Sequence, residues 1–138
     1  MILPIDIVYF SNYSGNTKRF VEKIDERNAI RIPIDSRSGG ITVDSPYVLF
    51  VPTYGGGEER TAIPRQVRSF LNVKENRRLL HGIVGMGNTN FGEHFCKAAD
   101  LISAKTGVPI LARVELMGTP EDVDKVIERM QLLYGQEV

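Results

Sequence analysis

Residues 5–24 read IDIVYFSNYSGNTKRFVEKI, and this stretch decides the fold. Residues 5–10 are branched, aromatic or apolar apart from one aspartate, which predicts a β-strand. In residues 18–26 the apolar side chains fall on one face of a helix. Between them, residues 11–17 carry hydroxyl and amide side chains around a single glycine. The stretch therefore predicts a strand, a polar loop and a helix in succession.

The same alternation of short apolar runs and helical patterns continues along the chain. Thr119 and Asp122 have the spacing of a capping box around Pro120, which predicts the start of the last helix. Gly107 is a natural helix stop. The remaining predicted elements are strands at 29–34, 47–52, 79–87 and 109–116, and helices near 62–72 and 93–106.

Strands that alternate with helices predict a parallel sheet with helices on both faces. Residues 47–52, YVLFVP, are continuously apolar, as expected of a strand buried on both faces. Pro33 favours an edge position for the second strand. The predicted fold is α/β: a flavodoxin-like, doubly wound, five-stranded parallel sheet with strand order 2-1-3-4-5, in a single domain over residues 1–138. Residues 35–46 show no clear helix and predict an irregular or single-turn linker.

The composition fits a soluble globular protein and argues against a nucleic-acid binder. Of 138 residues, 42% are hydrophobic and 25% are charged, and the formal net charge is zero, whereas nucleic-acid binding favours a basic excess. A lone cysteine, Cys96, excludes an internal disulfide. The N-terminal MILPIDIVYF lacks the basic region of a signal peptide, and the apolar runs are too short to cross a bilayer. We expect a cytoplasmic protein.

Polar or glycine-rich loops follow three central strands, at the sheet edge where ligands bind in this class of fold. The first loop, residues 11–17, leads into a helix N-terminus, where unpaired N–H groups and the helix dipole favour a phosphate. Gly15 permits close approach of the backbone, and further donors come from Ser11, Ser14, Asn16 and Thr17. The alternative is ordinary helix capping by Ser14 or Asn16. The loop matches neither a P-loop nor a dinucleotide motif.

The second and third loops complete a site of a recognisable shape. Residues 52–57, PTYGGG, offer flexible backbone without bulky side chains, although a glycine run can be merely mobile. Residues 85–95 supply Asn88 and Asn90 as hydrogen-bonding groups and Phe91 as a stacking surface, unless that ring folds back onto the core. A phosphate site, a flat slot and an aromatic wall suit a planar heterocycle on a phosphorylated chain. FMN has that shape.

Four stretches make the chain similar to a known family. VYFSNYSGNTKRFVEKI, VPTYGGG, IPRQVRSFLN and GNTNFGEHFCKAADLISAKTGVPILARVELMGTPEDV resemble the NrdI family, small flavodoxin-like FMN proteins that serve class Ib ribonucleotide reductase. The resemblance runs from about residue 7 to residue 126. The GNTNFGEHFC block and the ELMGTPEDV segment are more specific than a glycine-rich loop.

The resemblance implies a cofactor, a role and a set of site residues. Reduced FMN would react with dioxygen, and the superoxide-type oxidant would reach the radical-generating subunit of the reductase to assemble its dimanganese–tyrosyl radical cofactor. A second partner would reduce the flavin. The chain would be a redox accessory protein with no catalytic side chain and no metal of its own. The implied FMN-binding residues are Ser11, Asn12, Ser14, Gly15, Asn16, Thr17, Thr53, Tyr54, Gly55, Gly56, Gly57, Asn88, Asn90, Phe91 and Gly92.

The residue types agree with a flavin that reacts with oxygen. The chain has no tryptophan, and the glycines at 55–57 offer nothing large to cover a ring. We therefore expect one face or edge of the flavin to stay open. The glycine peptides could also turn a carbonyl toward the flavin N5–H after reduction, which would stabilise some redox states over others.

Other protein classes share this strand order. A general electron-transfer flavodoxin is the nearest alternative, although such proteins are usually strongly acidic and this chain is neutral. A phospho-receiver needs an aspartate after the third strand and a lysine after the fifth, where this chain has Pro52-Thr53 and Leu116-Met117. A small phosphatase needs an arginine six residues after Cys96, where Ile102 stands. We expect Cys96 to pack as a small apolar group.

Charge is unevenly distributed along the chain. Residues 60–78 contain six basic residues and one acidic residue, whereas residues 119–138 contain five acidic and two basic residues. Such asymmetry is typical of solvated helix faces, and it can also steer a charged partner. His81 and His94 lack the spacing of metal ligands.

Overall fold

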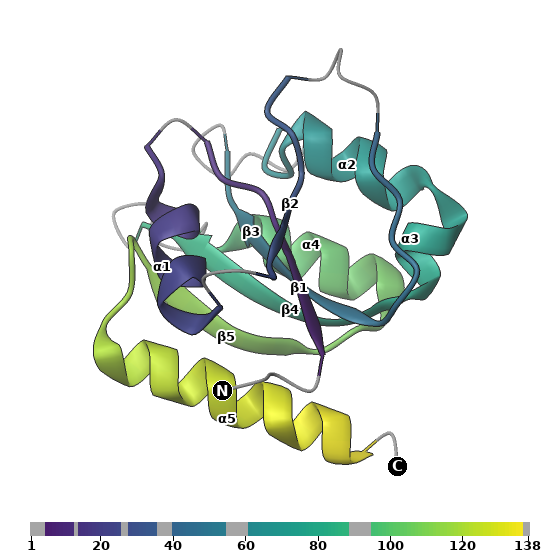
Figure 1. The fold of residues 1–138 in the computed structure, drawn as a ribbon. Coiled ribbons are helices and arrows are strands. Elements are labelled where there is room, and N and C mark those ends of the chain that lie inside the picture. Colours follow the sequence, from purple (N-terminus) through teal and green to yellow (C-terminus); the bar gives the residue numbers. More distant parts are fainter. Residues whose placement is uncertain are drawn as a thin grey trace.

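The computed structural model describes residues 5–12, 14–25, 28–35, 40–54, 61–88 and 95–136. Strands and helices alternate along most of the chain (Figure 1). The elements are β1 (Asp6–Tyr9), α1 (Asn16–Ile24), β2 (Ile30–Arg31), β3 (Tyr47–Pro52), α2 (Arg65–Asn72), α3 (Lys74–Arg78), β4 (Leu80–Gly87), α4 (Lys97–Thr106), β5 (Ile110–Glu115) and α5 (Pro120–Gln136).

The strands form one parallel sheet in the order β2-β1-β3-β4-β5, which confirms the predicted topology. In Figure 1, α1 and α5 cover one face of the sheet, and α2, α3 and α4 cover the other. Because all strands run the same way, β1, β3, β4 and β5 end at a common edge. This edge contains the candidate site. Within the described ranges, no helix combines the length and apolarity that crossing a membrane would require.

The alternation of side chains along each strand divides the core into two layers. Along β3, Val48 and Phe50 pack in the layer that contains α1 and α5, while Leu49 and Val51 pack in the layer that contains α2 and α4. All of these side chains are fully buried. The continuously apolar sequence of β3 is thus explained by burial on both faces, as predicted.

Several predicted boundaries were wrong by a few residues. α1 begins at Asn16 rather than residue 18, and α4 begins at Lys97 rather than residue 93. β2 was predicted over 29–34 but contains only Ile30 and Arg31. It lies at the sheet edge, as Pro33 indicated, and a proline shortly after it cannot donate to a ladder. The short helix α3 was not predicted, because a turn of five polar residues carries no apolar periodicity.

The predicted helix ends are confirmed in detail. The Thr119 N–H donates to Asp122 Oδ2 at 2.9 Å, and the Asp122 N–H donates to Thr119 Oγ1 at 3.2 Å, which is the reciprocal capping box. Gly107 ends α4 with a left-handed backbone at φ 75°. The start of α5 is therefore fixed by its own side chains.

Asn76 of α3 forms hydrogen bonds with the linker that precedes β3. Its side-chain amide donates to the carbonyls of Ile41 and Phe70, both at 3.0 Å, and its Oδ1 accepts from the Val43 N–H at 2.9 Å. The residue is fully buried, and its carbonyl accepts a bond from the hydroxyl of buried Tyr47. The described residues of the linker, 35 and 40–46, contain no helix or strand, in agreement with the prediction. One buried amide thus joins the described part of the linker, at Ile41 and Val43, to α2 and α3.

We predict that Asn76→Ala lowers the free energy of unfolding by about 3 kcal/mol, because buried backbone groups lose their partners. Asn72→Ala is the matched control, since Asn72 is an exposed asparagine at the end of α2, and it should change stability by less than about 0.5 kcal/mol. Urea denaturation of both variants measures the difference. Equal stability of the two variants would contradict the role given to Asn76.

Candidate functional site

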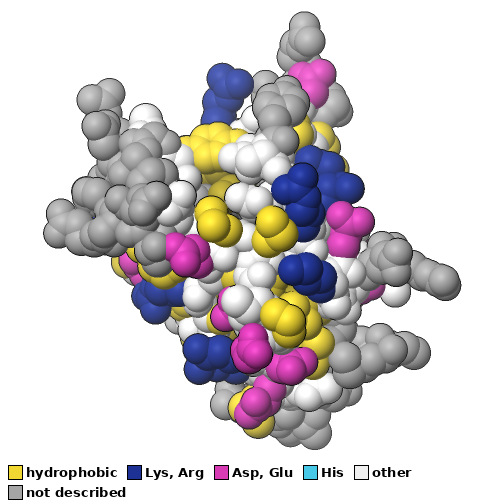
Figure 2. Space-filling model, turned by 90° about the vertical axis from the view of Figure 1, so that its left-hand side faces the viewer, with side chains coloured by type: hydrophobic (Ala, Val, Ile, Leu, Met, Phe, Trp, Pro, Cys, Tyr) yellow, Lys and Arg dark blue, Asp and Glu magenta, His cyan; other side chains and the backbone are white. Residues whose placement is uncertain are grey.

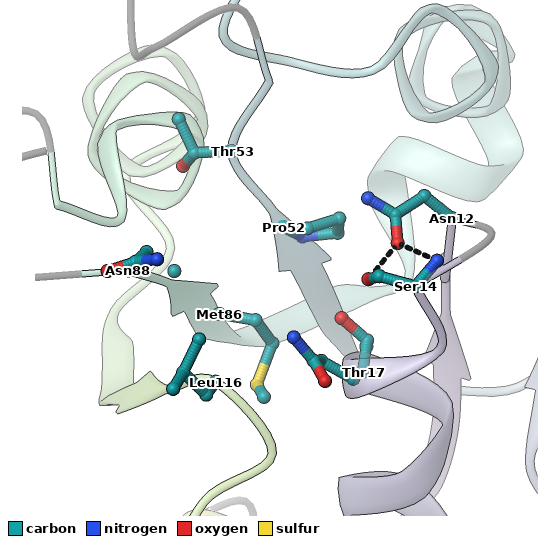
Figure 3. Close-up of a pocket in the computed structure, with 10 residues that line it drawn as sticks. Asn12, Ser14, Thr17, Pro52, Thr53, Met86, Asn88 and Leu116 are labelled. Carbon is teal, nitrogen blue, oxygen red and sulfur yellow. Dashed lines mark hydrogen bonds between the residues drawn. The ribbon is translucent and has the colours of Figure 1, made fainter. Parts of the chain in front are cut away.

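A cavity of about 240 Å³ lies at the carboxyl edge of the sheet. Its wall comes from the residues that end or follow β1, β3, β4 and β5, together with the start of α1. Figure 3 shows Asn12, Ser14 and Thr17 on one side and Asn88 and Leu116 on the other, with Pro52 and Met86 between them. The remaining lining residues are Asn16, Thr53 and Gly87.

The loop after β1 is organised by its own polar side chains. Asn12 Oδ1 accepts from both the N–H and the hydroxyl of Ser14, at 3.1 and 2.5 Å (Figure 3). Gly15 follows with φ 75°, a conformation that side chains other than glycine adopt at a cost. Exposed Arg19 donates from Nη1 to the Ser14 carbonyl at 3.0 Å. These hydrogen bonds fix Asn12 and Ser14 relative to each other, and both residues line the cavity.

The first turn of α1 lies at the cavity. Gly15 is the N-cap and makes no side-chain cap bond, so neither Ser14 nor Asn16 caps this helix. The buried Ser11 hydroxyl instead accepts from the Lys18 N–H at 3.1 Å. Among the described residues, nothing accepts from the N–H groups of Asn16 and Thr17. These two groups and the helix dipole favour an anion at this point.

The residues after β3 connect the cavity to α4. Thr53 is 9% exposed, and its Oγ1 accepts from the Ala98 N–H in the first turn of α4 at 3.0 Å. Tyr54 does not line this cavity. Its ring packs edge-on against Phe10, with the centroids 6.0 Å apart, and its N–H donates to the Ala62 carbonyl. Thr53 is therefore a cavity residue that also caps a helix, while Tyr54 lies beside the neighbouring surface.

The end of β4 brings α4 very close to the sheet. A Cβ on Gly87 would lie 3.0 Å from the Cys96 backbone nitrogen, and one on Gly85 would lie 2.9 Å from the Ala99 Cβ. Glycine at these positions is therefore required by packing. Cys96 precedes α4 with φ 59° and is fully buried, which confirms that it packs as a small apolar group. Burial raises the pKa of the Cys96 thiol to about 12, so the thiol stays protonated at neutral pH.

The turn after β5 adds an unpredicted wall residue. Leu116 has φ 54° and lines the cavity while remaining 46% exposed. The left-handed region costs a leucine roughly 1 kcal/mol. The sequence suggested no role for Leu116 beyond the fifth strand. A signal was nevertheless present, because β5 is predicted to end at the same edge as β4 and its last residues must lie near the site.

The cavity brings together six of the residues proposed from the sequence: Asn12, Ser14, Asn16, Thr17, Thr53 and Asn88. Ser11, Gly15 and Tyr54 lie close by but do not line it. Pro52, Met86, Gly87 and Leu116 line the cavity and were not among the proposed site residues. The other proposed residues lie outside the described part of the chain, namely Gly55, Gly56, Gly57, Asn90, Phe91 and Gly92.

The surface around this edge mixes apolar and charged side chains. Figure 2 shows hydrophobic groups near the middle of this side of the molecule, with basic groups around them and acidic groups gathered toward the bottom, where α5 lies in Figure 1. Among the described residues, no group of three or more His, Cys, Asp or Glu side chains could hold a metal ion.

Comparison with known proteins shows the family to which the chain is related. The family model described as "NrdI Flavodoxin like" matches residues 8–128. Protein NrdI of Brucella ovis is 50% identical over 131 residues, which are 95% of this chain and 96% of that protein. Protein NrdI of Brucella canis matches to the same extent. The chain belongs to the NrdI flavodoxin-like family. The resemblance seen in the sequence is thereby confirmed.

Solved structures support the fold of this NrdI-family chain independently. Oxidised Flavodoxin 2 from Bacillus cereus superposes with a TM-score of 0.62 at 20% identity and covers 97% of this chain and 99% of its own. Two-electron reduced Megasphaera elsdenii flavodoxin gives 0.58 at 17% identity, with 95% and 98% covered. At these identities the likeness concerns the fold alone.

The residues present fit the phosphorylated end of a flavin mononucleotide, the type of cofactor that a flavodoxin-like family implies. One side of the cavity has the hydroxyl and amide groups of Asn12, Ser14 and Thr17, while Pro52 and Met86 in the middle and Leu116 on the far side, next to Asn88, add apolar surface (Figure 3). A ligand that is anionic at one end and carbon-rich beyond it matches this division. The cavity volume of about 240 Å³ lies below the usual range of ligand pockets, which begins at roughly 300 Å³.

We predict that Cys96 makes the fold less stable in alkali. Its folded-state pKa lies above the unfolded value, so the stabilisation is complete at neutral pH and is lost as the pH rises from about 9 to about 12. Thermal melts from pH 7 to 11 should show a smaller alkaline loss of stability for Cys96→Ala than for the wild type. Rapid reaction of native Cys96 with a thiol reagent at pH 7 would contradict its burial.

Proposed function

We propose that this chain binds FMN and serves class Ib ribonucleotide reductase as a flavin-dependent activator. The observation that carries the proposal is the start of α1, where Asn16 and Thr17 of the first helical turn line a cavity at the carboxyl edge of the sheet together with Asn12 and Ser14 of the preceding loop. Membership of the NrdI family supports the flavin and the link with the reductase.

The loop after β1 would bind the phosphate of FMN. The N–H groups of Asn16 and Thr17 would donate to phosphate oxygens, and the Ser14 hydroxyl and the Asn16 side chain lie at the same cavity. Asn12 would act through Ser14, because its amide oxygen fixes the Ser14 hydroxyl and N–H. Gly15 would let the backbone turn tightly enough to present these donors. Ser11 would support the site indirectly, because its hydroxyl accepts a hydrogen bond from the Lys18 N–H in the first turn of α1.

The remaining proposed residues would lie along the flavin. Asn88 and Thr53 line the cavity on the side of β3 and β4, where a ribityl chain or ring would extend. The chain has no tryptophan, so no indole ring shields a bound flavin from gas. Tyr54, Gly55, Gly56, Gly57, Asn90, Phe91 and Gly92 complete the proposed set through the resemblance to the family.

The chemistry that bound FMN would supply is the reduction of dioxygen to a superoxide-type oxidant, used to assemble the dimanganese–tyrosyl radical cofactor of the radical-generating subunit. The side chains of this protein would position the cofactor and leave access for oxygen. None of them needs to move a proton, and the buried Cys96 thiol stays protonated. A separate protein would reduce the flavin.

The nearest alternative is a general electron-transfer flavodoxin. The zero net charge favours the activator, because carriers that dock onto basic partners are usually acidic. The two functions differ in the response of the reduced protein to air. The decisive assay mixes reduced protein, oxygen and manganese-loaded radical-generating subunit, and measures the tyrosyl radical by electron paramagnetic resonance. Absence of radical, with FMN bound and oxygen consumed, would favour the alternative.

We predict that the purified protein binds FMN more tightly than riboflavin, because the loop after β1 recognises the phosphate. Asn12→Ala should weaken FMN binding about tenfold by loosening that loop, and should leave riboflavin binding nearly unchanged. Asn28→Ala is the matched control, an exposed asparagine beyond the other end of α1. Titrations that follow flavin fluorescence measure all three proteins. Equal affinity of the wild type for both flavins would contradict a phosphate site.

We also predict that the basic start of α2 contributes to docking of the reductase subunit. Arg65 and Arg68 are exposed and line a surface hollow of about 470 Å³ with Tyr54 and Thr61, beside the candidate site. Arg65→Glu with Arg68→Glu should weaken binding by roughly tenfold at low salt and by much less at high salt. The control variant, Arg77→Glu with Arg78→Glu, makes the same charge change just before β4, where the strand begins rather than ends. Similar affinities for the two double variants would remove this hypothesis.

A further inference from the structure

Two residues other than glycine have a positive φ among those that the structure describes: Leu116, which lines the cavity, and Cys96, which lies against the lining residue Gly87. Cys96 is fully buried, so its packing accounts for the unfavourable backbone. Leu116 is 46% exposed, so complete burial of its side chain does not account for a leucine at this position. A glycine or asparagine would adopt this backbone without the same strain. The leucine side chain therefore has a reason to be present that the fold alone does not supply.

The backbone around Leu116 is held in place from several sides. The Leu116 N–H donates to the Gly87 carbonyl at 2.8 Å, which joins the turn to the end of β4. The Gly118 N–H donates to the Glu115 carbonyl at 2.9 Å and closes the turn. Lys23 of α1 donates from Nζ to the Met117 carbonyl at 3.3 Å. Strain persists where the surroundings fix the backbone in this way, and such positions concentrate at ligand sites.

Close packing fixes the distance between this turn and α1. Gly118 has φ 73°, and a Cβ there would lie only 2.5 Å from the Phe20 ring. The turn therefore rests directly on α1, the helix whose first residues face the cavity. Leu116 and the start of α1 are consequently held as opposite walls of one space, as Figure 3 shows for Leu116 and Thr17.

We propose that Leu116 is a ligand-contacting residue, held in a left-handed turn so that its side chain forms an apolar wall for the carbon-rich part of the flavin. Met86 and Pro52 line the same cavity and continue this apolar surface. The hydroxyls and amides of the loop after β1 lie across the cavity and take the phosphate. The inference rests on the proposed flavin function and adds a residue that holds the ring or ribityl chain rather than the phosphate.

The test compares FMN and riboflavin binding by full-length apoprotein carrying Leu116→Ala or Leu116→Gly. Both variants should lose about tenfold in affinity, and by the same factor for both flavins, since an apolar contact of leucine size is removed from a part that both ligands share. The melting temperature of Leu116→Gly should equal or exceed that of the wild type, because glycine relieves the backbone strain. Met117→Ala is the matched control, an equally exposed neighbour that does not line the cavity, and it should bind both flavins normally.

The other outcomes overturn the proposal in distinguishable ways. Unchanged flavin affinity in both Leu116 variants, with a wild type that binds FMN, would remove the ligand contact and leave the proposed function intact. A lowered melting temperature in both variants would give Leu116 a structural role instead. A loss of affinity for FMN alone would mean that Leu116 acts on the phosphate and not on the part that both flavins share. A wild-type protein that binds neither flavin would remove the proposed function, and this inference with it.

Discussion

The parallel pairing of the five strands is the constraint on which the rest of the structure depends. Because β1, β3, β4 and β5 run in one direction, the residues that follow them meet at one edge, although they are separated by most of the chain. Successive side chains of a strand point to opposite faces of the sheet, and both faces are buried against helices. The cavity is a direct result, since its wall is built from the ends of these strands and the first turn of α1.

The sequence predicted the fold well, because the signals that define it are local. Apolar runs gave the strands, the Thr119–Asp122 spacing gave the start of α5, and Gly107 gave the end of α4. The prediction was wrong where stability comes from distant contacts. α3 consists of polar residues and is secured through Asn76, whose partners at Ile41, Val43 and Phe70 no local pattern reveals. β2 is short because its pairing ends near Pro33.

For the candidate site, the sequence predicted the segments involved but not the contacts that their side chains make. Hydroxyls and amides beside a glycine gave the loop after β1, and the topology rule placed Asn88 and Thr53 at the same edge. The exact function of each side chain was not predictable, because it depends on tertiary contacts. Ser11 turns inward to Lys18, Thr53 binds the start of α4, and Leu116 reaches the cavity only through a left-handed turn.

The capping of the helices has a consequence for ligand selection. Three helices, α1, α4 and α5, begin near the ends of β1, β4 and β5. Thr53 occupies a donor at the start of α4, and Asp100 adds negative charge to its first turn. Thr119 and Asp122 close the start of α5 in the same way. Of these three helices, α1 is the one whose first turn has no acidic residue and whose first two N–H groups have no side-chain partner among the described residues, so a phosphate group would bind at α1 rather than at α4 or α5.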